Sequence, residues 1–517
     1  MLHFLHHFPR SGFARTSLVL RSASTKASTP LAAAHLLYDK QYINGKWVPS
    51  SNKDSFIDVT DSNTGEIFAT VADGTAVDTE QAIIAASNAF HSWSNLSLLE
   101  RKRYIQQILE EYEKVKPDIA NALTKELGAP QEFAKNVHSE LYPFYSRQYL
   151  SIVDEYEWVE ELDDIALVVK EPIGVVGAIT PWNWPLNQIA CKMVPALLAG
   201  CTFVLKPSEV TPINAYLLTE AVHASGLPPG VFNMVCGTGP KVGEVLATHP
   251  LVDMVSFTGS TGVGKHLHML GSSTVKRVRS ELGGRSAIVV LPDATAEQIE
   301  MMATQILENS GQSCLGLGRM IAPGSRYEEI VQIARDAFEK VQVVEASNEA
   351  AKTGDIGPVA SRTQYDKIRS YIQKGIEEGA RLVTGGLEAP PNTPTSGYFI
   401  KPTIFADAHN DMTVVREEIF GPVLCIIPYE SEEEAIDIAN DTIYGLSNAV
   451  IGADQEHAMK IASRLRSGQV HVNTLVRGPT APFGGYKQSG DGREIGVYGL
   501  EEFLQIKSIH RPKPAVK

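Results

Sequence analysis

A thiol and a carboxylate stand in segments that could bring both of them to a reacting carbonyl group. Cys314 follows Gly311-Gln312-Ser313, and Glu281 opens the run Glu281-Leu282-Gly283-Gly284, 33 positions earlier. A thiol in a small, polar, turn-forming segment can ionise and attack a carbonyl carbon. A carboxylate held by a glycine turn can activate a water molecule. The pair indicates covalent chemistry through a thioester that is then hydrolysed.

A third polar side chain could stabilise the charge that such an attack creates. Asn183 stands between Trp182 and Trp184 in a turn bounded by prolines. Its amide can donate a hydrogen bond to a developing oxyanion, and the backbone N–H of Cys314 is the expected second donor. The alternative for Asn183 is a turn residue that bonds its own backbone.

Six motifs, in this order, resemble those of the NAD(P)-dependent aldehyde dehydrogenases, and the likeness runs from about Tyr42 to Ile509. The motifs are Pro181-Trp182-Asn183-Trp184-Pro185, Lys206-Pro207-Ser208-Glu209, Phe257-Thr258-Gly259-Ser260-Thr261, Glu281-Leu282-Gly283-Gly284, Gly311-Gln312-Ser313-Cys314 and Glu418-Ile419-Phe420-Gly421-Pro422. The resemblance implies oxidation of an aldehyde to a carboxylic acid, with Cys314 as nucleophile, Glu281 as general base and Asn183 as oxyanion donor. The presence of Glu281 argues against the branch in which coenzyme A takes the acyl group.

The resemblance also implies a set of cofactor-binding residues. In the family, Lys206 and Glu209 meet the adenosine ribose; a glutamate there would repel a 2′-phosphate, which favours NAD and leaves NADP open. Ser260 opens a predicted helix whose amino end can hold a pyrophosphate. The full set is Pro181, Trp182, Lys206, Ser208, Glu209, Gly239, Gly243, Gly259, Ser260 and Leu282, with Glu418 and Phe420 at the nicotinamide ribose and ring.

Two rival classes of protein stay open on the sequence. The segment 259–265 matches most of a phosphate-binding P-loop, which predicts magnesium-dependent nucleotide hydrolysis, but His266 stands where the magnesium ligand should be Ser or Thr. His266 and His268 do not share a helix face, so no metal site is expected. The second rival is a catalytically silent scaffold with the same fold.

Composition narrows the class of protein. The chain has 517 residues, 43% hydrophobic and 21% charged, which is typical of a globular protein of two or three domains. A net charge of −14 argues against nucleic acid and anionic membranes as partners. The five cysteines are few, odd in number and without a C-x-x-C pair, which suits a reducing compartment and argues against a structural zinc site.

The first 37 residues differ from the rest. They carry four basic residues and no acid before Asp39, the composition of a mitochondrial transit peptide. This predicts a mitochondrial matrix location; the alternative is a plain amino-terminal tail.

Strand and helix patterns alternate after residue 167 and predict an α/β fold with parallel sheets. We expect a transit peptide at 1–37, a Rossmann-like NAD-binding domain at 38–150 and 172–282, and an α/β catalytic domain at 283–483. Segments 151–171 and 484–510 are strand-like, and the resemblance makes them a small β oligomerisation element of a homodimer or homotetramer.

Local signals predict several element boundaries. Asn44-Gly45 predicts a hairpin turn. Asp78 and Ser97 each open a predicted capping box, and Pro117 is expected to begin a further helix that Gly128 ends.

Overall fold

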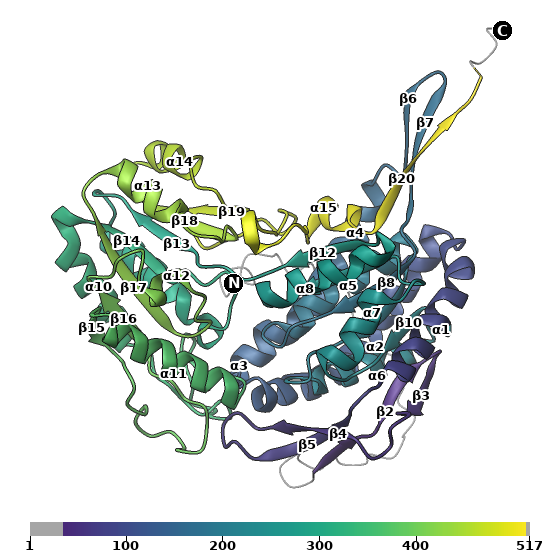
Figure 1. Cartoon of the computed structure of the whole chain (residues 1–517), viewed down its shortest axis with the longest axis horizontal. Coiled ribbons are helices and arrows are strands. Elements are labelled where there is room, and N and C mark those ends of the chain that lie inside the picture. The colour runs from purple at the N-terminus through teal and green to yellow at the C-terminus, as the bar shows by residue number, and fades with distance from the viewer. Residues whose placement is uncertain (1–34, 513–517) are drawn as a thin grey trace, which may run out of the picture.

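The computed structural model describes residues 35–512, so nearly all of the predicted transit peptide lies outside the described residues. Two α/β lobes lie side by side, each built on its own seven-stranded sheet, and a narrow arm projects from one of them (Figure 1). This agrees with the predicted fold class.

The first sheet has the strand order β12-β11-β8-β9-β10-β2-β3. Its five central strands are parallel, and the hairpin β2–β3 pairs antiparallel at one edge. The strands are β2 (Lys40–Ile43), β3 (Lys46–Pro49), β8 (Val175–Ile179), β9 (Thr202–Lys206), β10 (Phe232–Met234), β11 (Met254–Thr258) and β12 (Arg277–Glu281). The chain runs outward from β8 in both directions, so the order reverses between β8 and β11, and the crevice at such a reversal is where open α/β sheets bind ligands.

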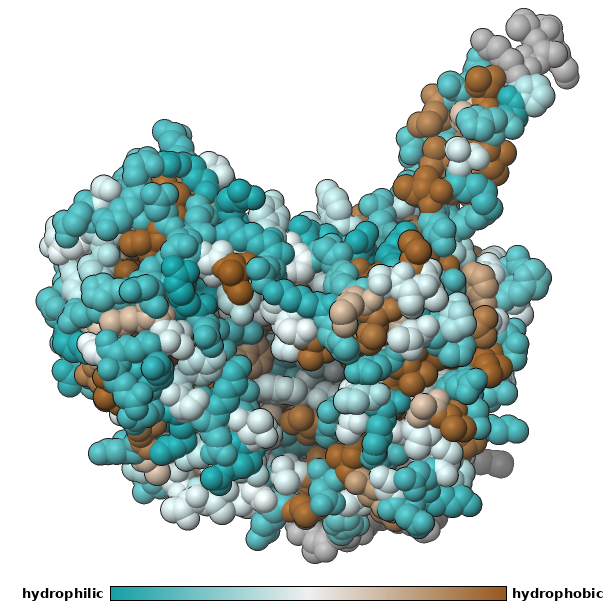
Figure 2. Space-filling view, in the orientation of Figure 1, coloured by the Kyte–Doolittle hydropathy of each residue, from teal (hydrophilic) through white to brown (hydrophobic). Residues whose placement is uncertain are grey.

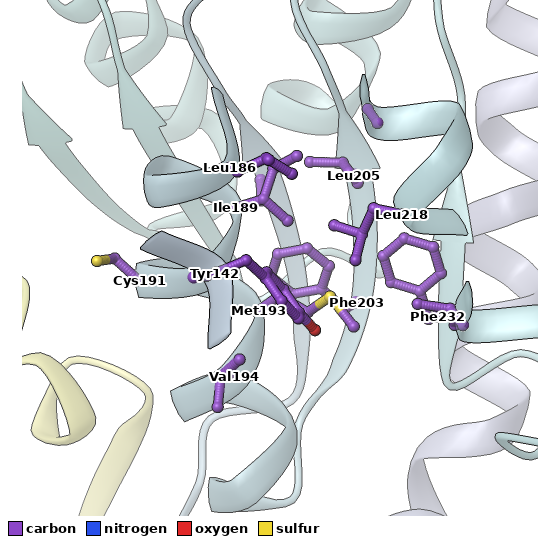
Figure 3. Close-up of a cluster of buried hydrophobic side chains, with 14 of the residues drawn as sticks. Tyr142, Leu186, Ile189, Cys191, Met193, Val194, Phe203, Leu205, Leu218 and Phe232 are labelled. Atoms are coloured by element: carbon purple, nitrogen blue, oxygen red, sulfur yellow. The ribbon is translucent and has the colours of Figure 1, made fainter. Parts of the chain in front are cut away.

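Helices cover both faces of this sheet because alternate strand residues point to opposite sides. Val204 and Val255 pack with the helices of one face, and Phe203 and Met254 with those of the other. The first group is α1 (Ala76–Ser94), α7 (Glu244–Thr248) and α8 (Thr261–Gly271); the second is α2 (Leu98–Glu126), α3 (Gln131–Phe133), α4 (Ser139–Glu155), α5 (Pro185–Ala199) and α6 (Ile213–Ala224). Figure 3 shows the second core, where α5 side chains such as Ile189 and Met193 lie beside Phe203.

The second sheet has the order β15-β16-β17-β14-β13-β18-β19, parallel except for β15. Its strands are β13 (Ala287–Val290), β14 (Arg319–Pro323), β15 (Arg381–Thr384), β16 (Thr403–Ala406), β17 (Val423–Tyr429), β18 (Ser447–Ile451) and β19 (Gln469–Val472). Only five residues separate the end of β12 from the start of β13. The carboxyl end of the first sheet therefore lies next to the amino end of the second.

Helices again cover both faces. Ile288 and Val290 pack on one side of β13, and Ala287 and Val289 on the other. The helices are α9 (Ala296–Thr304), α10 (Tyr327–Glu339), α11 (Arg362–Glu377), α12 (Thr413–Arg416), α13 (Glu432–Asn440), α14 (Gln455–Ala462) and α15 (Gly496–Glu501), of which α15 packs on the first lobe.

The projecting arm is an antiparallel sheet with the order β20-β7-β6 (Figure 1). It joins β6 (Val159–Asp163) and β7 (Ala166–Pro172) to β20 (Leu504–His510), so segments more than 300 positions apart pair along their whole length. A further small sheet, β1-β5-β4, joins β1 (Leu36–Tyr38), β4 (Phe56–Thr60) and β5 (Ile67–Ala72).

Three local predictions are confirmed and three are wrong. Asn44-Gly45 forms the β2–β3 turn, with φ of 52° and 74°. Ser97 caps α2 in a capping box with Glu100, and Gly128 follows α2 with φ of 80°. The first capping box begins at Thr75, with Asp78 as its third helical residue. Pro117 lies inside α2 and begins no helix. Segments 151–155 and 496–501 are helical, so the strand-like prediction holds only for the arm strands.

Candidate active site

The polar motifs gather at the carboxyl edge of the first sheet. Pro181 and Trp182 follow β8, Gly259 follows β11, Lys206 ends β9 and Glu281 ends β12. Because these strands are parallel and adjacent, all of these residues reach the same edge.

Cys314 lies in a turn between the irregular 3₁₀ segment Gln305–Gly311 and β14. It is half-buried, whereas Cys191, Cys201, Cys236 and Cys425 are fully buried. Gln312 anchors the turn, since its amide oxygen accepts from the Ala360 N–H at 2.8 Å and its amide nitrogen donates to the Asn309 carbonyl at 3.1 Å. Cys314 is thus the one accessible thiol among the described cysteines, which fits a nucleophile.

Asn183 lies against the same turn. Its side-chain amide donates to the Gln312 carbonyl at 3.0 Å, and its own carbonyl accepts from the Asn309 side chain at 2.9 Å. Asn309 is in turn bonded to the buried ring of His138, whose pKa burial lowers to about 4, so the ring is neutral. These bonds hold Asn183, the predicted oxyanion donor, against the backbone of Gln312, which lies two residues before Cys314, the predicted nucleophile.

Asn309 and Ser310 are residues that the sequence analysis missed. Both have left-handed backbones, with φ of 54° and 58°, and Gly311 follows with φ of 77°. Three such residues in a row are unusual, and strain of this kind occurs often at functional sites. A Cβ on Gly311 would overlap the backbone of Gly421, so only glycine fits there. The asparagine next to a serine and a glycine was the only signal for this turn in the sequence.

The surroundings of the Cys314 thiol disfavour its thiolate form. Burial raises its pKa to about 12, the charges of Glu418 and Glu281 act in the same direction, and the charge of Arg477 opposes them. A thiolate must therefore be formed by a base or by added positive charge before the sulfur can attack.

Glu281 is buried, and neither oxygen of its carboxylate has a hydrogen-bond partner within residues 35–512. Burial and the charge of Glu494 raise its pKa well above the usual range, while Lys192 and Arg493 act against that shift. A carboxyl group with a raised pKa is suited to take and release protons near neutral pH.

Lys192 and Glu494 form a buried ion pair beside Glu281 that sequence reasoning missed. The Lys192 ammonium also donates to the Thr258 hydroxyl at 2.8 Å. A cavity of about 10 Å³, room for about one water molecule, is lined by Glu281, Lys192 and Glu494. These contacts connect Glu281 to two further groups that can exchange protons.

The predicted adenosine-side residues cluster after β9. The Lys206 ammonium is buried and pairs with the Glu209 carboxylate at 2.6 Å, and it also donates to the Pro207 carbonyl at 3.1 Å. The Ser208 hydroxyl accepts from the Val210 N–H at 3.3 Å. An acidic residue after the second strand of the unit fits the place where a ribose hydroxyl is bound in dinucleotide sites.

The predicted nicotinamide-side residues come from distant segments and meet. The Glu418 carboxylate accepts from the Gly284 N–H at 2.9 Å, and the rings of Phe420 and Trp182 make an edge contact with centroids 5.4 Å apart. A Cβ on Gly283 would overlap the Glu418 carboxylate. Leu282 is buried and donates its N–H to the Ser489 carbonyl at 2.8 Å.

The glycine and serine candidates lie at two helix starts. Gly239 and Gly243 bound a short π-helical turn after β10, and nothing lies within 4 Å of a Cβ built on Gly239. Gly259 packs so closely on Phe257 that a Cβ would overlap the ring, and Ser260 caps α8.

The P-loop alternative does not survive the structure. Because α8 begins at Thr261, most of the segment 259–265 is helical and no loop is left to wrap a phosphate. His266 pairs with Glu244 and His268 with Ser280, and residues 35–512 contain no cluster of three metal-binding side chains. Within the same residues no helix has the length and apolarity to cross a membrane.

The site fits a dinucleotide. A parallel sheet with its order reversed between β8 and β11, an acidic residue after β9 and a capped helix start after β11 are the features that hold NAD in Rossmann-like folds. This edge, with a half-buried thiol beside it, fits the class of NAD(P)-dependent oxidoreductases.

Comparison with known proteins identifies the family. The sequence model of the aldehyde dehydrogenase family matches residues 47–509. A 3-succinoylsemialdehyde-pyridine dehydrogenase from a Pseudomonas species is 45% identical over 475 residues, 91% of this chain and 98% of that protein. The chain therefore belongs to the aldehyde dehydrogenase family, and it is an NAD-dependent enzyme that oxidises an aldehyde to a carboxylic acid.

Solved structures agree with this family. An aldehyde dehydrogenase C mutant of Pseudomonas syringae, complexed with NAD⁺ and octanal, is 41% identical with a TM-score of 0.89, covering 94% of this chain and 98% of that one. A Mycobacterium tuberculosis aldehyde dehydrogenase complexed with NAD⁺ is 40% identical with the same TM-score, covering 94% of this chain and all of that one (100%).

The predicted mitochondrial matrix location is wrong on this comparison. The relatives named above come from bacteria, which have no mitochondria. The transit peptide predicted with it has no support.

Proposed function

We propose that Cys314 is the nucleophile of the reaction. Its thiolate adds to the aldehyde carbon, and the resulting thiohemiacetal is oxidised to a thioester. The observation that carries this proposal is the placement of a half-buried thiol two residues from the carbonyl that the Asn183 amide contacts. Asn183 would release Gln312 and, with the Cys314 N–H, donate to the oxyanion.

Glu281 is the general base in this proposal. Its raised pKa and its unpaired oxygens suit a group that takes a proton from water and passes it on. The ion pair of Lys192 and Glu494 offers the route by which that proton leaves, through the small cavity that all three line. The attacked thioester then releases the carboxylic acid and restores the thiol.

The cofactor residues follow the edge of the first sheet. NAD, when bound at this edge, would supply the acceptor for the hydride that leaves the substrate. Lys206, Ser208 and Glu209 hold the adenosine side, and Glu209 disfavours a 2′-phosphate. The residues that would contact the pyrophosphate and the nicotinamide of the cofactor are Pro181, Trp182, Gly239, Gly243, Gly259, Ser260, Leu282, Glu418 and Phe420.

We also propose that residues 38–150 and 172–282 form the NAD-binding domain and residues 283–483 the catalytic domain. The arm would join copies of the chain in a homo-oligomer. The arm exposes apolar side chains along its length, and Figure 2 shows them as brown spheres on the projection. Ile506 is 76% exposed and Leu162 61% exposed. Apolar side chains exposed together on one surface are typical of a protein–protein contact. Light scattering on Ile506→Glu, with Ile376→Glu on α11 as control, should show dissociation only for the first variant.

The test of the function is NADH formation. Wild type should reduce NAD⁺ with a neutral aldehyde, and Cys314→Ala should not. Equal rates of NADH formation by wild type and Cys314→Ala would show that Cys314 is not the nucleophile.

A further inference from the structure

Arg477 stands where two cavities meet. It lines a cavity of about 320 Å³ and a second of about 690 Å³, and Leu475, Val476 and His471 form the rest of the shared wall. The second cavity also reaches Leu315, the residue next to Cys314. Arg477 therefore lies in the wall of a cavity that extends to the residue after Cys314.

The Arg477 guanidinium has no hydrogen-bond or ion-pair partner within residues 35–512, although the side chain is half-buried. A cation in partial burial without a partner is costly unless a ligand supplies the opposite charge. Most half-buried arginines of the described chain are bonded, as Arg277 and Arg369 are to backbone carbonyls.

The smaller cavity has little else that carries charge. Its wall is mainly apolar, with Val137, Leu141 and Ile495 among its residues, and its one carboxylate, Glu140, pairs with Lys116 at 2.8 Å. Burial lowers the pKa of His471 to about 4, so this ring is neutral. Arg477 is thus the single uncompensated charge of this cavity.

Arg477 is also near the reacting centre. Its positive charge lowers the pKa of the Cys314 thiol against the effect of burial, and it acts on Tyr145 in the cavity wall as well. The cavity that both Arg477 and Leu315 line gives a substrate joined to Cys314 a space in which to extend toward the guanidinium.

We propose that Arg477 binds a carboxylate at the far end of the substrate, so that this enzyme prefers aldehydes that carry a carboxylate a few carbons from the carbonyl. The guanidinium fork matches the two oxygens of such a group. This proposal rests on the proposed function, and it adds the substrate class. Apart from Arg477, the larger cavity is lined by four acids (Glu132, Glu300, Glu308 and Asp355) and two lysines (Lys340 and Lys352). Because the acids outnumber the lysines there, the carboxylate is assigned to the smaller cavity.

A matched substrate pair tests it. Wild type, Arg477→Gln and Arg477→Lys are assayed with a short aldehyde bearing a terminal carboxylate and with its uncharged methyl ester. Arg335→Gln, which removes an exposed arginine paired with Glu339 on α10, is the control. We expect wild type to favour the carboxylate by about tenfold or more in kcat/KM, because a charge-assisted bond contributes at least that factor.

The ratio of the two kcat/KM values decides the outcome. Arg477→Gln should reduce this ratio at least about tenfold, mainly through KM, Arg477→Lys should keep part of it, and Arg335→Gln should keep all of it. A wild type without preference, or a Gln variant that loses both substrates in the same proportion, overturns the proposal.

A second readout separates carboxylate binding by Arg477 from stabilisation of the Cys314 thiolate. If Arg477 served only to stabilise the thiolate, Arg477→Gln would slow alkylation of Cys314 by iodoacetamide while the substrate ratio stayed constant. If wild type oxidises neither the carboxylate aldehyde nor the ester in a Cys314-dependent way, the proposed function fails, and the substrate inference is not the cause.

Discussion

The side-chain amide of Asn183, in the turn between β8 and α5, donates to the carbonyl of Gln312. Gln312 lies 129 positions after Asn183 and two residues before Cys314. The two lobes thus meet at a bond that places an amide donor beside a thiol. Asn309 holds both of these segments in place. Its side-chain amide donates to the Asn183 carbonyl at 2.9 Å and to the Gln312 carbonyl at 3.3 Å.

Asn183→Ala should lower kcat by about 100- to 1000-fold, the usual effect of losing one oxyanion donor. Steady-state assays with a neutral aldehyde check this. Asn95→Ala, at an exposed asparagine bonded to the His91 carbonyl at the end of α1, is the control and should keep normal kinetics. A loss of tenfold or less for Asn183→Ala would speak for a turn residue with no part in the chemistry.

Glu281→Gln should separate the two halves of the reaction. We expect a rapid burst of about one NADH per subunit followed by turnover slowed by about 100-fold or more, because thioester hydrolysis loses its base. Stopped-flow absorbance measures both phases. In wild type the base is the deprotonated form, and its pKa is raised, so the hydrolysis rate should rise with pH through that pKa. The Gln variant should lack this rise; a variant that keeps it would assign the titration to another group.

Glu418→Gln should make Cys314 more reactive in the free enzyme. The Glu418 charge is, after burial, the largest influence that raises the pKa of the thiol, and glutamine can still accept from the Gly284 N–H. Alkylation of Cys314 by iodoacetamide at pH 8, followed by peptide mapping, should therefore be faster. Glu417→Gln, at an exposed neighbour bonded to Tyr371, is the control. Unchanged alkylation in Glu418→Gln would mean that its charge does not reach the sulfur.

Glu126→Ala should destabilise the first lobe. The buried Glu126 carboxylate accepts from the N–H groups of Ile213 and Asn214 at 2.8 and 3.0 Å and so caps α6. Loss of these bonds should lower the free energy of unfolding by about 2–4 kcal/mol, and Glu126→Gln, which keeps one acceptor, by less.

The pH dependence of the same site has a definite sign. Burial raises the pKa of Glu126 to about 7. The folded chain then binds this proton more tightly than the unfolded chain, so the contribution to stability is present at low pH and declines between about pH 4.3 and 7. In thermal melts, the stability of wild type relative to Glu126→Gln should therefore fall as the pH rises across this range. A difference that stays constant would contradict the raised pKa.

The sequence predicted the fold class well because that class depends on local signals: parallel strands were predicted from apolar runs between helices. The roles of Cys314 and Glu281, inferred from their small, polar neighbours and from the family resemblance, stay predictions. Pro117 was misplaced because tertiary packing tolerates a proline within α2.

The partners of the site could not be predicted in the same way. Lys192 and Glu494 are 302 positions apart and lie in unremarkable helical and loop sequence, so only the fold brings them to Glu281. Arg477 is one of many arginines in the sequence; its lack of a partner and its place between two cavities are properties of packing.

The central claim is that one sulfur forms the covalent bond to the substrate. Incubating Glu281→Gln with NAD⁺ and an aldehyde should trap the acyl group, and intact-protein mass spectrometry with peptide mapping locates it. The account predicts an added acyl mass on the peptide that contains Cys314 and none in Glu281→Gln with Cys314→Ala. An acyl group on Cys191, Cys201, Cys236 or Cys425, or NADH formation that persists without Cys314, would contradict it.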